Sequence, residues 1–297
     1  MVRMAHEVDE STFERLRSRL FGIGYRMLGS RAEAEDIVQD TYLRWHQADQ
    51  GSIDNPEAWL VTAATRRAID RLRALKTERE TYAGPWLPEP LMSEEPPPPD
   101  RQLDLASDLS VAFLVLLERL SPEERAAFLL HDVFDTDYRE LAQTLGKSEA
   151  ACRQIVHRAR QRVKRDRKRF PASEGVRAHL LRRFIAAVEA QDETAMMALF
   201  APGATWTADG GGKVPASPRA IVGADRIVRL VMGLARKFFA GRGRFHLATV
   251  NGETGLAHRL DGALTSVLAF ETDGERILAV SVIVNPDKLR DPRLPAG

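Results

Sequence analysis

From residue 12 to about residue 81, apolar positions recur at the three- and four-residue spacing of amphipathic helices. The positions that set this period are Phe13, Leu16, Leu20, Ile37, Thr41 and Trp45. Ser30 is a suitable N-cap, and Glu33 in the following turn complements the helix dipole. Pro56 suits the first turn of another helix. The pattern therefore predicts a helical bundle.

The helical pattern stops between Ala83 and Asp100, where seven of the chain's sixteen prolines fall. Consecutive prolines favour extended or polyproline backbone, so this stretch is predicted to be a linker. The apolar part from Trp86 to Leu91 is expected to dock on a surface. The part from Glu94 to Asp100 is expected to be a solvated spacer.

A second helical block follows from about Gln102 to Phe170, with four short helices expected. Ser121 and Glu124 have the spacing of a capping box around Pro122. After Pro171 two helices are expected between residues 174 and 200, and one more over about 224–238. Segments rich in β-branched residues predict strands at 204–207, 245–251, 264–270 and 277–284. This part is predicted to be an α+β domain with an antiparallel sheet.

The chain of 297 residues is thus expected to hold more than one domain. The predicted divisions are a helical module over 1–82, a proline-rich linker over 83–101, a second helical module over 102–171 and an α+β domain over 172–297. The expected fold class is multidomain: two all-α modules followed by an α+β domain.

The stretch from Tyr138 to Ala151 has the form of a helix-turn-helix. Leu141 and Leu145 would face inward on the first helix, Gly146 suits a positive-φ helix end, and Ser148 would cap the second helix. These local signals agree on a DNA-reading unit.

The second helix of this unit is expected to bury a stripe of apolar residues at four-residue intervals, namely Ala151, Ile155, Ala159 and Val163. Its other side chains suit a major groove, because arginines bind phosphates and residues near the N-terminus reach base edges. The residues expected to face DNA are Ser148, Glu149, Ala150, Arg153, Gln154, His157 and Arg158. The alternative is a solvated basic helix face. The residues from Arg162 to Arg169 are expected to contact phosphates or aid solubility rather than read bases.

Tyr138 to Lys164 resembles region 4 of the extracytoplasmic-function sigma factors, and Leu120 to Arg125 resembles the entry to that region. The resemblance implies that this module reads the −35 promoter element. Ala34 to Trp45 likewise resembles region 2 of these factors, where the helix packs on the clamp of RNA polymerase. The residues that the resemblance assigns to polymerase binding are Asp36, Ile37, Gln39, Asp40 and Leu43.

Asn55 to Leu60 leads into a basic segment, Arg66 to Arg73, that is similar to the part of region 2 that opens the −10 element. A basic groove suits the backbone of an opened strand. The residues expected to contact this strand are Arg66, Arg67, Asp70, Arg71 and Arg73, whereas Trp59 is expected in the core. Many family members have asparagine where this chain has Arg66, so strand binding is predicted here and no base preference.

The part after residue 174 resembles a SnoaL-like domain, a curved sheet wrapped by helices into a cone with an internal cavity. Three short motifs match the subgroup of sigma factors with a SnoaL-like C-terminal extension. They are Trp86-Leu87-Pro88-Glu89-Pro90, Asp209-Gly210-Gly211-Gly212-Lys213 and Asn285-Pro286-Asp287-Lys288-Leu289. The glycines alone would fit an ordinary tight turn. Our hypothesis is that the first and third motifs dock near this turn, and that the fused domain is an internal regulator, whether inhibitory, assisting or both.

The composition excludes some kinds of site, but its overall charge does not identify a binding partner. Lysine and arginine number 43 against 42 acidic residues, and Cys152 is the only cysteine, so an internal disulfide is excluded. A run of about 18 uncharged apolar residues does not occur, so we expect a cytoplasmic protein without membrane contact. No cofactor, metal or nucleotide-binding loop is predicted. The expected partners are core RNA polymerase and promoter DNA, and the free protein is expected to be monomeric.

Two other classes of function stay open. The α+β domain could bind a small molecule or catalyse a reaction, with Asp209, Asp225, His246, Glu253 and His258 as titratable candidates that are each expected at the surface or in turns. A plain repressor with one helix-turn-helix would leave the first helical block unexplained. Sigma activity without catalysis is the interpretation that covers the whole chain.

Overall fold

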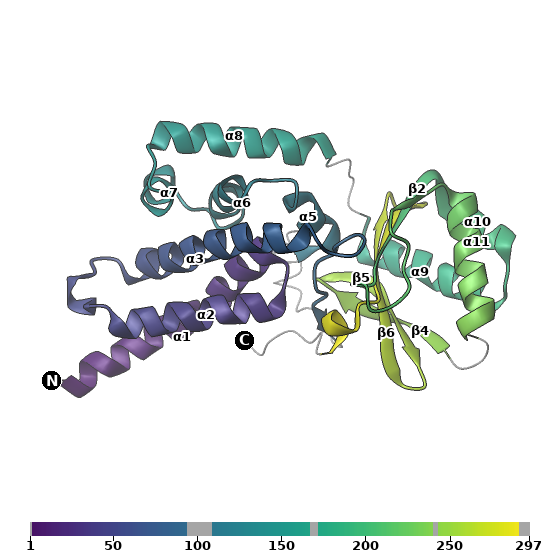
Figure 1. Cartoon of the computed structure of the whole chain (residues 1–297), viewed down its shortest axis with the longest axis horizontal. Helices are drawn as coiled ribbons and strands as arrows, with labels where there is room; N and C mark the ends of the chain where they lie inside the picture. The colour runs from purple at the N-terminus through teal and green to yellow at the C-terminus, as the bar shows by residue number, and fades with distance from the viewer. Residues whose placement is uncertain (1, 94–108, 167–171, 240–242, 291–297) are drawn as a thin grey trace. The chain divides into compact units, whose positions relative to one another are not determined.

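The computed structural model describes residues 2–93, 109–166, 172–239 and 243–290 (Figure 1). These residues form two compact units. The first contains the described residues up to Glu80 and those from Leu116 to Asp166, and the second contains the described residues of Thr81–Val115 and those from Ala172 to Arg290. The predicted spacer from Glu94 to Asp100 and the end of the basic stretch, residues 167–169, lie outside the described residues.

The first unit begins with an N-terminal module of three helices, α1 (Val2–Leu28), α2 (Arg31–Gln47) and α3 (Pro56–Arg79). The Ser30 side chain caps α2 by accepting from the Glu33 amide, and Pro56 begins α3, as the sequence pattern predicts. Asn55 caps α3 by accepting from the Ala58 amide. Aromatic side chains fill the core between the helices, and the rings of Trp45 and Trp59 lie 5.4 Å apart. The predicted helical bundle is confirmed.

The same unit holds a helix-turn-helix module. Its helices are α5 (Val111–Leu117, whose last two residues belong here), α6 (Pro122–Phe128), α7 (Tyr138–Leu145) and α8 (Glu149–Asp166), with a π-helical turn η3 (Leu129–Val133) after α6. The capping box of Ser121 and Glu124 forms. Gly146 ends α7 with φ 63°, and Ser148 accepts from the Ala151 amide at the start of α8. The described part of this block thus contains the four short helices that the sequence predicts.

The buried stripe of α8 differs from the predicted one. Cys152, Ile155, Val156, Ala159 and Val163 are buried, whereas Ala151 is half-buried. A strict four-residue spacing drifts around a helix of 3.6 residues per turn, so the buried face follows alternating steps of three and four.

The second unit is an α+β domain. Its helical segments are α9 (Glu174–Glu189), α10 (Glu193–Leu199), α11 (Ala224–Leu234) and the turns η4 (Ala235–Phe239) and η5 (Pro286–Leu289). Its strands are β1 (Met92–Ser93), β2 (Phe200–Asp209), β3 (Ile221–Val222), β4 (Gly243–Val250), β5 (Glu253–Leu260), β6 (Ala263–Thr272) and β7 (Ile277–Ile283). They form one sheet in the order β1-β4-β5-β6-β7-β2-β3.

The expectation of a wholly antiparallel sheet is wrong. Strands β4 to β7 form an antiparallel meander, but β2 pairs with β7 in parallel, with Trp206 opposite Val280. Hairpin connections make neighbours antiparallel, whereas β2 and β7 are separated by the whole meander, which permits parallel pairing. Strand β5 was also missed, because its sequence has few β-branched residues.

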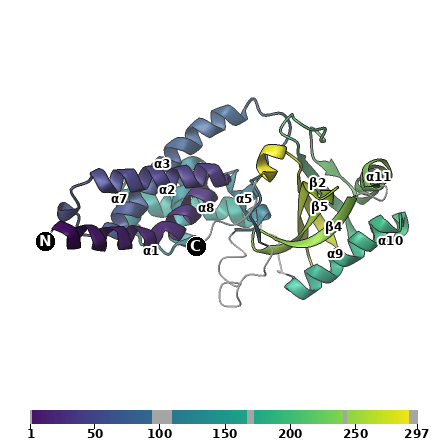
Figure 2. The same cartoon turned by 90° about the horizontal axis from the view of Figure 1, so that it is seen from below.

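Both faces of the sheet are covered by other parts of the second unit. Helices α9, α10 and α11 lie on one side of it in Figures 1 and 2, where Phe184, Met232 and Phe270 belong to the larger core. The other face contributes Val267 and Ile283 to a second, smaller core. That core is completed by residues from the linker, α5 and η5, namely Leu87, Val111 and Leu289. The linker is therefore part of the folded second unit.

Candidate functional site

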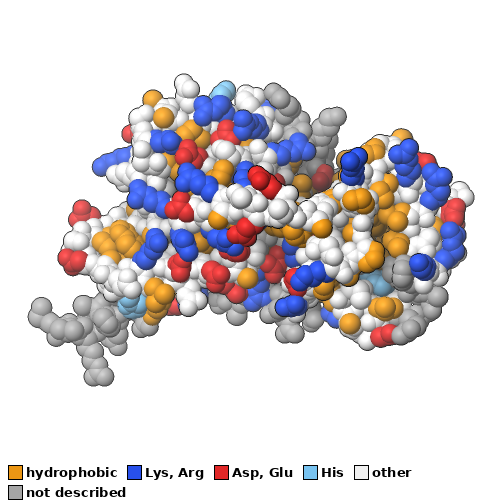
Figure 3. Space-filling view, in the orientation of Figure 1, with side chains coloured by type: hydrophobic (Ala, Val, Ile, Leu, Met, Phe, Trp, Pro, Cys, Tyr) orange, Lys and Arg blue, Asp and Glu red, His pale blue; other side chains and the backbone are white. Residues whose placement is uncertain are grey.

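The outward face of α8 carries the residues that the sequence assigns to DNA. Ser148, Glu149, Ala150, Arg153, Gln154, His157 and Arg158 are all exposed. The Arg153 guanidinium donates to Glu149 over 2.8 Å and lies over the Tyr138 ring, 5.0 Å from its centroid. Figure 3 shows Lys and Arg side chains along α8 and α3, with acidic side chains between them. The arrangement suits contact with a polyanion.

Further along α8, arginines pair with acidic side chains of the same module. Arg160 binds Asp132 over 2.5 Å, and Arg162 binds Glu124 over 2.5 Å. Arg158 also approaches Glu124, at 3.8 Å. The arginines are about half exposed, but the side chains of Asp132 and Glu124 are only 19% and 9% exposed, so a phosphate would have to replace a largely buried partner.

The candidate polymerase-binding surface lies on α2. Asp36, Gln39 and Leu43 are exposed, and Leu43 keeps 48% of its surface accessible. Ile37, however, is only 2% exposed, so its assignment to the polymerase surface is wrong. It lies one turn from Thr41 on the inward face of the amphipathic helix and packs in the core. Asp40 is half-buried and accepts from Arg67 over 2.7 Å.

The basic residues of α3 that were assigned to the opened strand all have protein partners. Arg71 donates to Glu33 and Glu78, Arg67 to Asp40, and Arg73 to Asp70 and Glu123. Arg66 donates to backbone carbonyls of α7. A DNA strand would have to compete with these partners.

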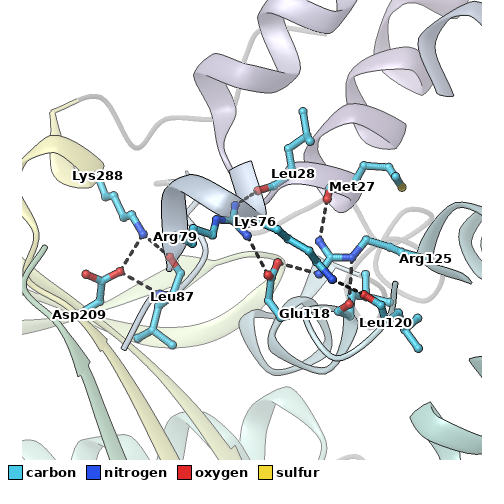
Figure 4. Close-up of polar contacts among 11 residues, drawn as sticks. Met27, Leu28, Lys76, Arg79, Leu87, Glu118, Leu120, Arg125, Asp209 and Lys288 are labelled. Atoms are coloured by element: carbon cyan, nitrogen blue, oxygen red, sulfur yellow. Dashed lines mark hydrogen bonds and ion pairs between the residues drawn. The ribbon is translucent and has the colours of Figure 1, made fainter. Parts of the chain in front are cut away.

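A buried carboxylate joins the three predicted motifs in the second unit. The Asp209 side chain is fully buried at the end of β2 and accepts from the Tyr82 hydroxyl over 2.6 Å and from the Leu87 amide over 2.8 Å. It also accepts from the Gly211 amide over 3.0 Å and from the Lys288 ammonium over 2.7 Å. Figure 4 shows Asp209, Lys288 and Leu87 converging. We call these groups the Asp209 hub.

Lys288 connects the C-terminal motif to the linker. Its ammonium donates to the Leu87 carbonyl over 2.5 Å and lies 4.2 Å from the centroid of the Trp86 ring. Burial and the hydrogen bond to Asp209 raise the pKa of Tyr82, which therefore stays a hydrogen-bond donor. Trp86 is half-buried, and Leu87, Pro88 and Pro90 are buried.

The glycine turn is shaped by the C-terminal motif. Gly211 has φ 60°, and a Cβ there would overlap the Asn285 side chain. A Cβ on Gly210 would overlap the Val214 carbonyl. Lys213 pairs with Asp287 across the two motifs. Gly211 therefore requires glycine for close approach as well as for backbone conformation, whereas Gly210 requires it for close approach alone.

Asn251 fastens two segments to the sheet domain, the described linker at Leu91 and the chain just before α5 at Leu109. Its side chain accepts from the Leu91 amide over 3.0 Å and donates to the Leu109 carbonyl over 3.0 Å. Its backbone amide donates to the Leu91 carbonyl over 2.7 Å. Next to it, β1 pairs with β4, with Met92 opposite Val250.

The titratable residues considered for catalysis lie in different environments. Asp209 and His258 are buried, contrary to the expectation of surface or turn positions. Glu253 pairs with Arg177, and Asp225 with Arg229. The three carboxylates among them, Asp209, Asp225 and Glu253, thus each pair with a different cation.

Among these candidates, His258 has a pKa that is shifted from its ordinary value. Burial, together with the nearby His246, lowers the pKa of His258 to about 4. Its Nδ1 lies 2.7 Å from the Thr265 hydroxyl, and its ring packs on Phe245. A histidine of this kind is neutral near pH 7 and fits a structural position.

Sequence reasoning missed Tyr82 and Asn251, and also Glu118, whose carboxylate accepts from Arg79 and from the buried Arg125 over 2.7 Å each. Asn251-Gly252 is an Asn-Gly pair between β4 and β5, a hairpin signal that the sequence does offer. Its contacts with the linker depend on tertiary structure. Tyr82 and Glu118 carry no local motif that marks their partners.

Comparisons with known proteins cover nearly the whole chain. Residues 12–78 match the family Sigma-70 region 2, and residues 110–163 match the family Sigma-70, region 4. The chain is 38% identical over 294 residues to the ECF RNA polymerase sigma factor SigJ of Mycobacterium tuberculosis, covering 95% of this chain and 93% of that one. A probable ECF RNA polymerase sigma factor SigI of the same organism is 28% identical over 300 residues, covering 98% of each. The crystal structure of the Mycobacterium tuberculosis extracytoplasmic function sigma factor SigJ superposes with a TM-score of 0.75 at 37% identity, covering 94% of this chain and 98% of that one. In the part that the structure describes, no helix has both the length and the apolarity to cross a membrane.

Proposed function

This chain belongs to the extracytoplasmic-function RNA polymerase sigma factors, which direct RNA polymerase to specific promoters for transcription initiation, and we propose how its parts divide that work. The N-terminal module binds core RNA polymerase through α2 and the opened −10 strand through α3. The helix-turn-helix module reads the −35 element with the first turns of α8. The protein acts in the cytoplasm, where both partners are found.

The exposed acidic and apolar groups of α2 support the polymerase contact. Asp36, Gln39 and Leu43 lie on the outer face, and the exposed Leu43 would bury apolar surface on docking. The exposed N-terminal residues of α8 support duplex recognition, since a helix enters the major groove with these residues against base edges.

The C-terminal domain acts as a regulator within the same chain. It binds the linker that connects the two promoter-binding modules. The observation that carries this proposal is the Asp209 hub, where one buried carboxylate binds the linker through Tyr82 and Leu87 and the C-terminal motif through Lys288. Asn251 adds a second anchor. A linker fixed in this way has less reach than a free chain of the same length, so docking limits how far the two modules can separate.

In-vitro transcription with core RNA polymerase tests this division of work. A promoter selected from a random library would be transcribed with the full chain, with a version ending before Asn285 and with a version ending after Phe170. Promoter-specific transcripts from any version establish sigma activity. A changed output after removal of the C-terminal motif establishes regulation and gives its sign. If none of the versions binds core polymerase, the proposal is wrong.

A further inference from the structure

Two side chains hold the exposed arginine near the start of α8. Arg153 donates to Glu149, one turn earlier on the same helix, over 2.8 Å. Its guanidinium also lies over the ring of Tyr138, the first residue of α7, at 5.0 Å from the ring centroid. The Arg153 side chain is 56% exposed, and an arginine so exposed samples many rotamers when nothing holds it. The two contacts therefore order a side chain that would otherwise be mobile.

The Tyr138 ring is itself fixed by a neighbouring histidine. Its centroid lies 4.2 Å from that of the His131 ring, and the two ring planes are inclined by 37°. Nδ1 of His131 lies 2.9 Å from the Thr136 carbonyl oxygen, and since a carbonyl oxygen only accepts, Nδ1 is the donor. Thr136 is buried, so this bond ties the imidazole to the interior of the helix-turn-helix module. A chain of contacts thus leads from a buried residue to the exposed guanidinium of Arg153.

These contacts leave N–H donors of Arg153 available to DNA. The attraction to the Tyr138 ring acts on the positive charge and does not require an N–H donor. Glu149 accepts from Nη2, which leaves the hydrogens of Nε and Nη1 for a base edge. A guanine presents two acceptors in the major groove, and the planar fork of an arginine binds both of them. Arg153 is therefore ordered in advance and still equipped to read a base.

Ordering of this kind favours the correct base over the others. An arginine loses rotamer freedom when it binds a base edge in one geometry, and it loses less when it contacts phosphates loosely. A side chain that is ordered before binding avoids this loss in the specific complex. An exposed cation–π contact changes an equilibrium constant by about two- to five-fold. The Tyr138 ring should contribute a factor of this size to base preference and little to overall affinity.

We propose that Tyr138, supported by His131, is a positioning residue that sets the base preference of Arg153 in the −35 element. This inference rests on the proposed reading of that element by the first turns of α8. Tyr138 belongs to α7, the helix that precedes the reading helix. Base preference is then determined in part by a side chain outside α8.

A promoter library tests the positioning role in transcription. The full chain with core RNA polymerase would transcribe promoters randomised in the −35 element, and transcript counts give the preference at each base pair. Arg153→Ala identifies the base pair that Arg153 reads. Tyr138→Leu removes the ring but keeps an apolar side chain, and it should lower the preference at that base pair about two- to five-fold. Tyr138→Phe is the matched control, which keeps the ring and should keep the native preference.

A spectroscopic measurement reports on the same contact without DNA. In the full chain with isotope-labelled arginine, the Nε–H signal of Arg153 is assigned by its absence from Arg153→Lys. This signal should carry a ring-current shift in the native chain and in Tyr138→Phe, and should lose it in Tyr138→Leu. A native signal at the position of an unstacked arginine would overturn the inference.

The library results can also overturn it. The positioning role is wrong if Tyr138→Leu keeps the native base preference, or if Tyr138→Phe loses as much preference as Tyr138→Leu. It is also wrong if the loss is spread evenly over the −35 element, because one arginine acts at one base pair. A native chain without any base preference in this element would instead refute the proposed function of α8. The Nε–H signal would then still show whether the ring and the guanidinium are stacked.

Discussion

Replacing Asp209 by asparagine should release the linker from the C-terminal domain. The substitution keeps the shape of the side chain but removes its charge, so Lys288 loses its ionic partner and faces an amide. Breaking a buried ion pair by removing one member costs about 3–5 kcal/mol. The Lys288 side chain is 12% exposed and keeps its bond to the Leu87 carbonyl, which favours the lower end, about 3 kcal/mol. Since each 1.4 kcal/mol is ten-fold, the docking equilibrium should weaken by about a hundred-fold.

Hydrogen exchange of the full chain would measure this directly. The amides of Leu87 and Leu91 donate to Asp209 and Asn251, so both are protected while the linker is docked. In Asp209→Asn, the Leu87 amide should exchange about a hundred-fold faster, and Leu91 should follow if the segment undocks as one piece. The matched control is Asp287→Asn, an exposed carboxylate of the C-terminal motif whose ion-pair partners, Lys213 and Arg290, are not groups of the hub. It should leave linker exchange nearly unchanged.

A double variant separates loss of charge balance from loss of shape. Lys288→Met alone leaves Asp209 buried without its cation and should also speed exchange. Asp209→Asn combined with Lys288→Met removes both charges, so the combined effect should be smaller than the sum of the two. Additive effects would show that the ion pair is not what couples the motifs. Unchanged exchange in Asp209→Asn would refute the hub as the anchor of the linker.

Three further predictions concern other parts of the molecule. The pKa of His258 is about 4 in the folded state and about 6.5 in the unfolded state, so on acidification the unfolded state binds the proton first. The free energy of unfolding should therefore fall by at most about 3 kcal/mol between pH 6.5 and 4, and urea melts of His258→Gln should show a flatter pH dependence in this range. Arg153→Ala should weaken −35 duplex binding by about 1–3 kcal/mol and relax base preference at one position, whereas Arg160→Ala should weaken all sequences alike, as selection from randomised duplexes would reveal. Arg125→Lys should destabilise the first unit by roughly 2 kcal/mol in urea titration, because one ammonium cannot replace three directed donors; an unchanged midpoint would contradict this.

The parts of the fold that sequence could predict are those governed by neighbouring residues. The cap at Ser30, the capping box at Ser121 and the left-handed Gly146 each involve partners within four or five positions, and all three form as expected. Amphipathic spacing likewise placed the helices of the first unit. The wrong or missing predictions concern residues whose partners lie far away in the sequence. Nothing local distinguishes a parallel from an antiparallel neighbour for β2, and the polar sequence of β5 hides a strand that is buried between β4 and β6.

The candidate sites divide in the same way. Exposure of the α8 residues followed from helical periodicity, but Ile37 was placed on the polymerase surface by motif resemblance although its spacing with Thr41 already pointed inward. The linker motif, the glycine motif and the C-terminal motif could be recognised in the sequence, but the contacts among them could not. Asp209 binds groups from residues 82, 87 and 288, and no periodicity links positions so far apart.

Arg66 shows why a departure from a family pattern is informative only with a structure. The resemblance described above marks the position because the family pattern has asparagine there, and taken alone the difference is interpreted as an altered base contact. The structure gives the longer side chain a second set of partners, the carbonyls at the end of α7. Asparagine is three side-chain atoms shorter along its length and would leave those carbonyls without this donor. The arginine at this position binds a helix end in the first unit, and the same charge would suit a phosphate of the strand that α3 is proposed to bind.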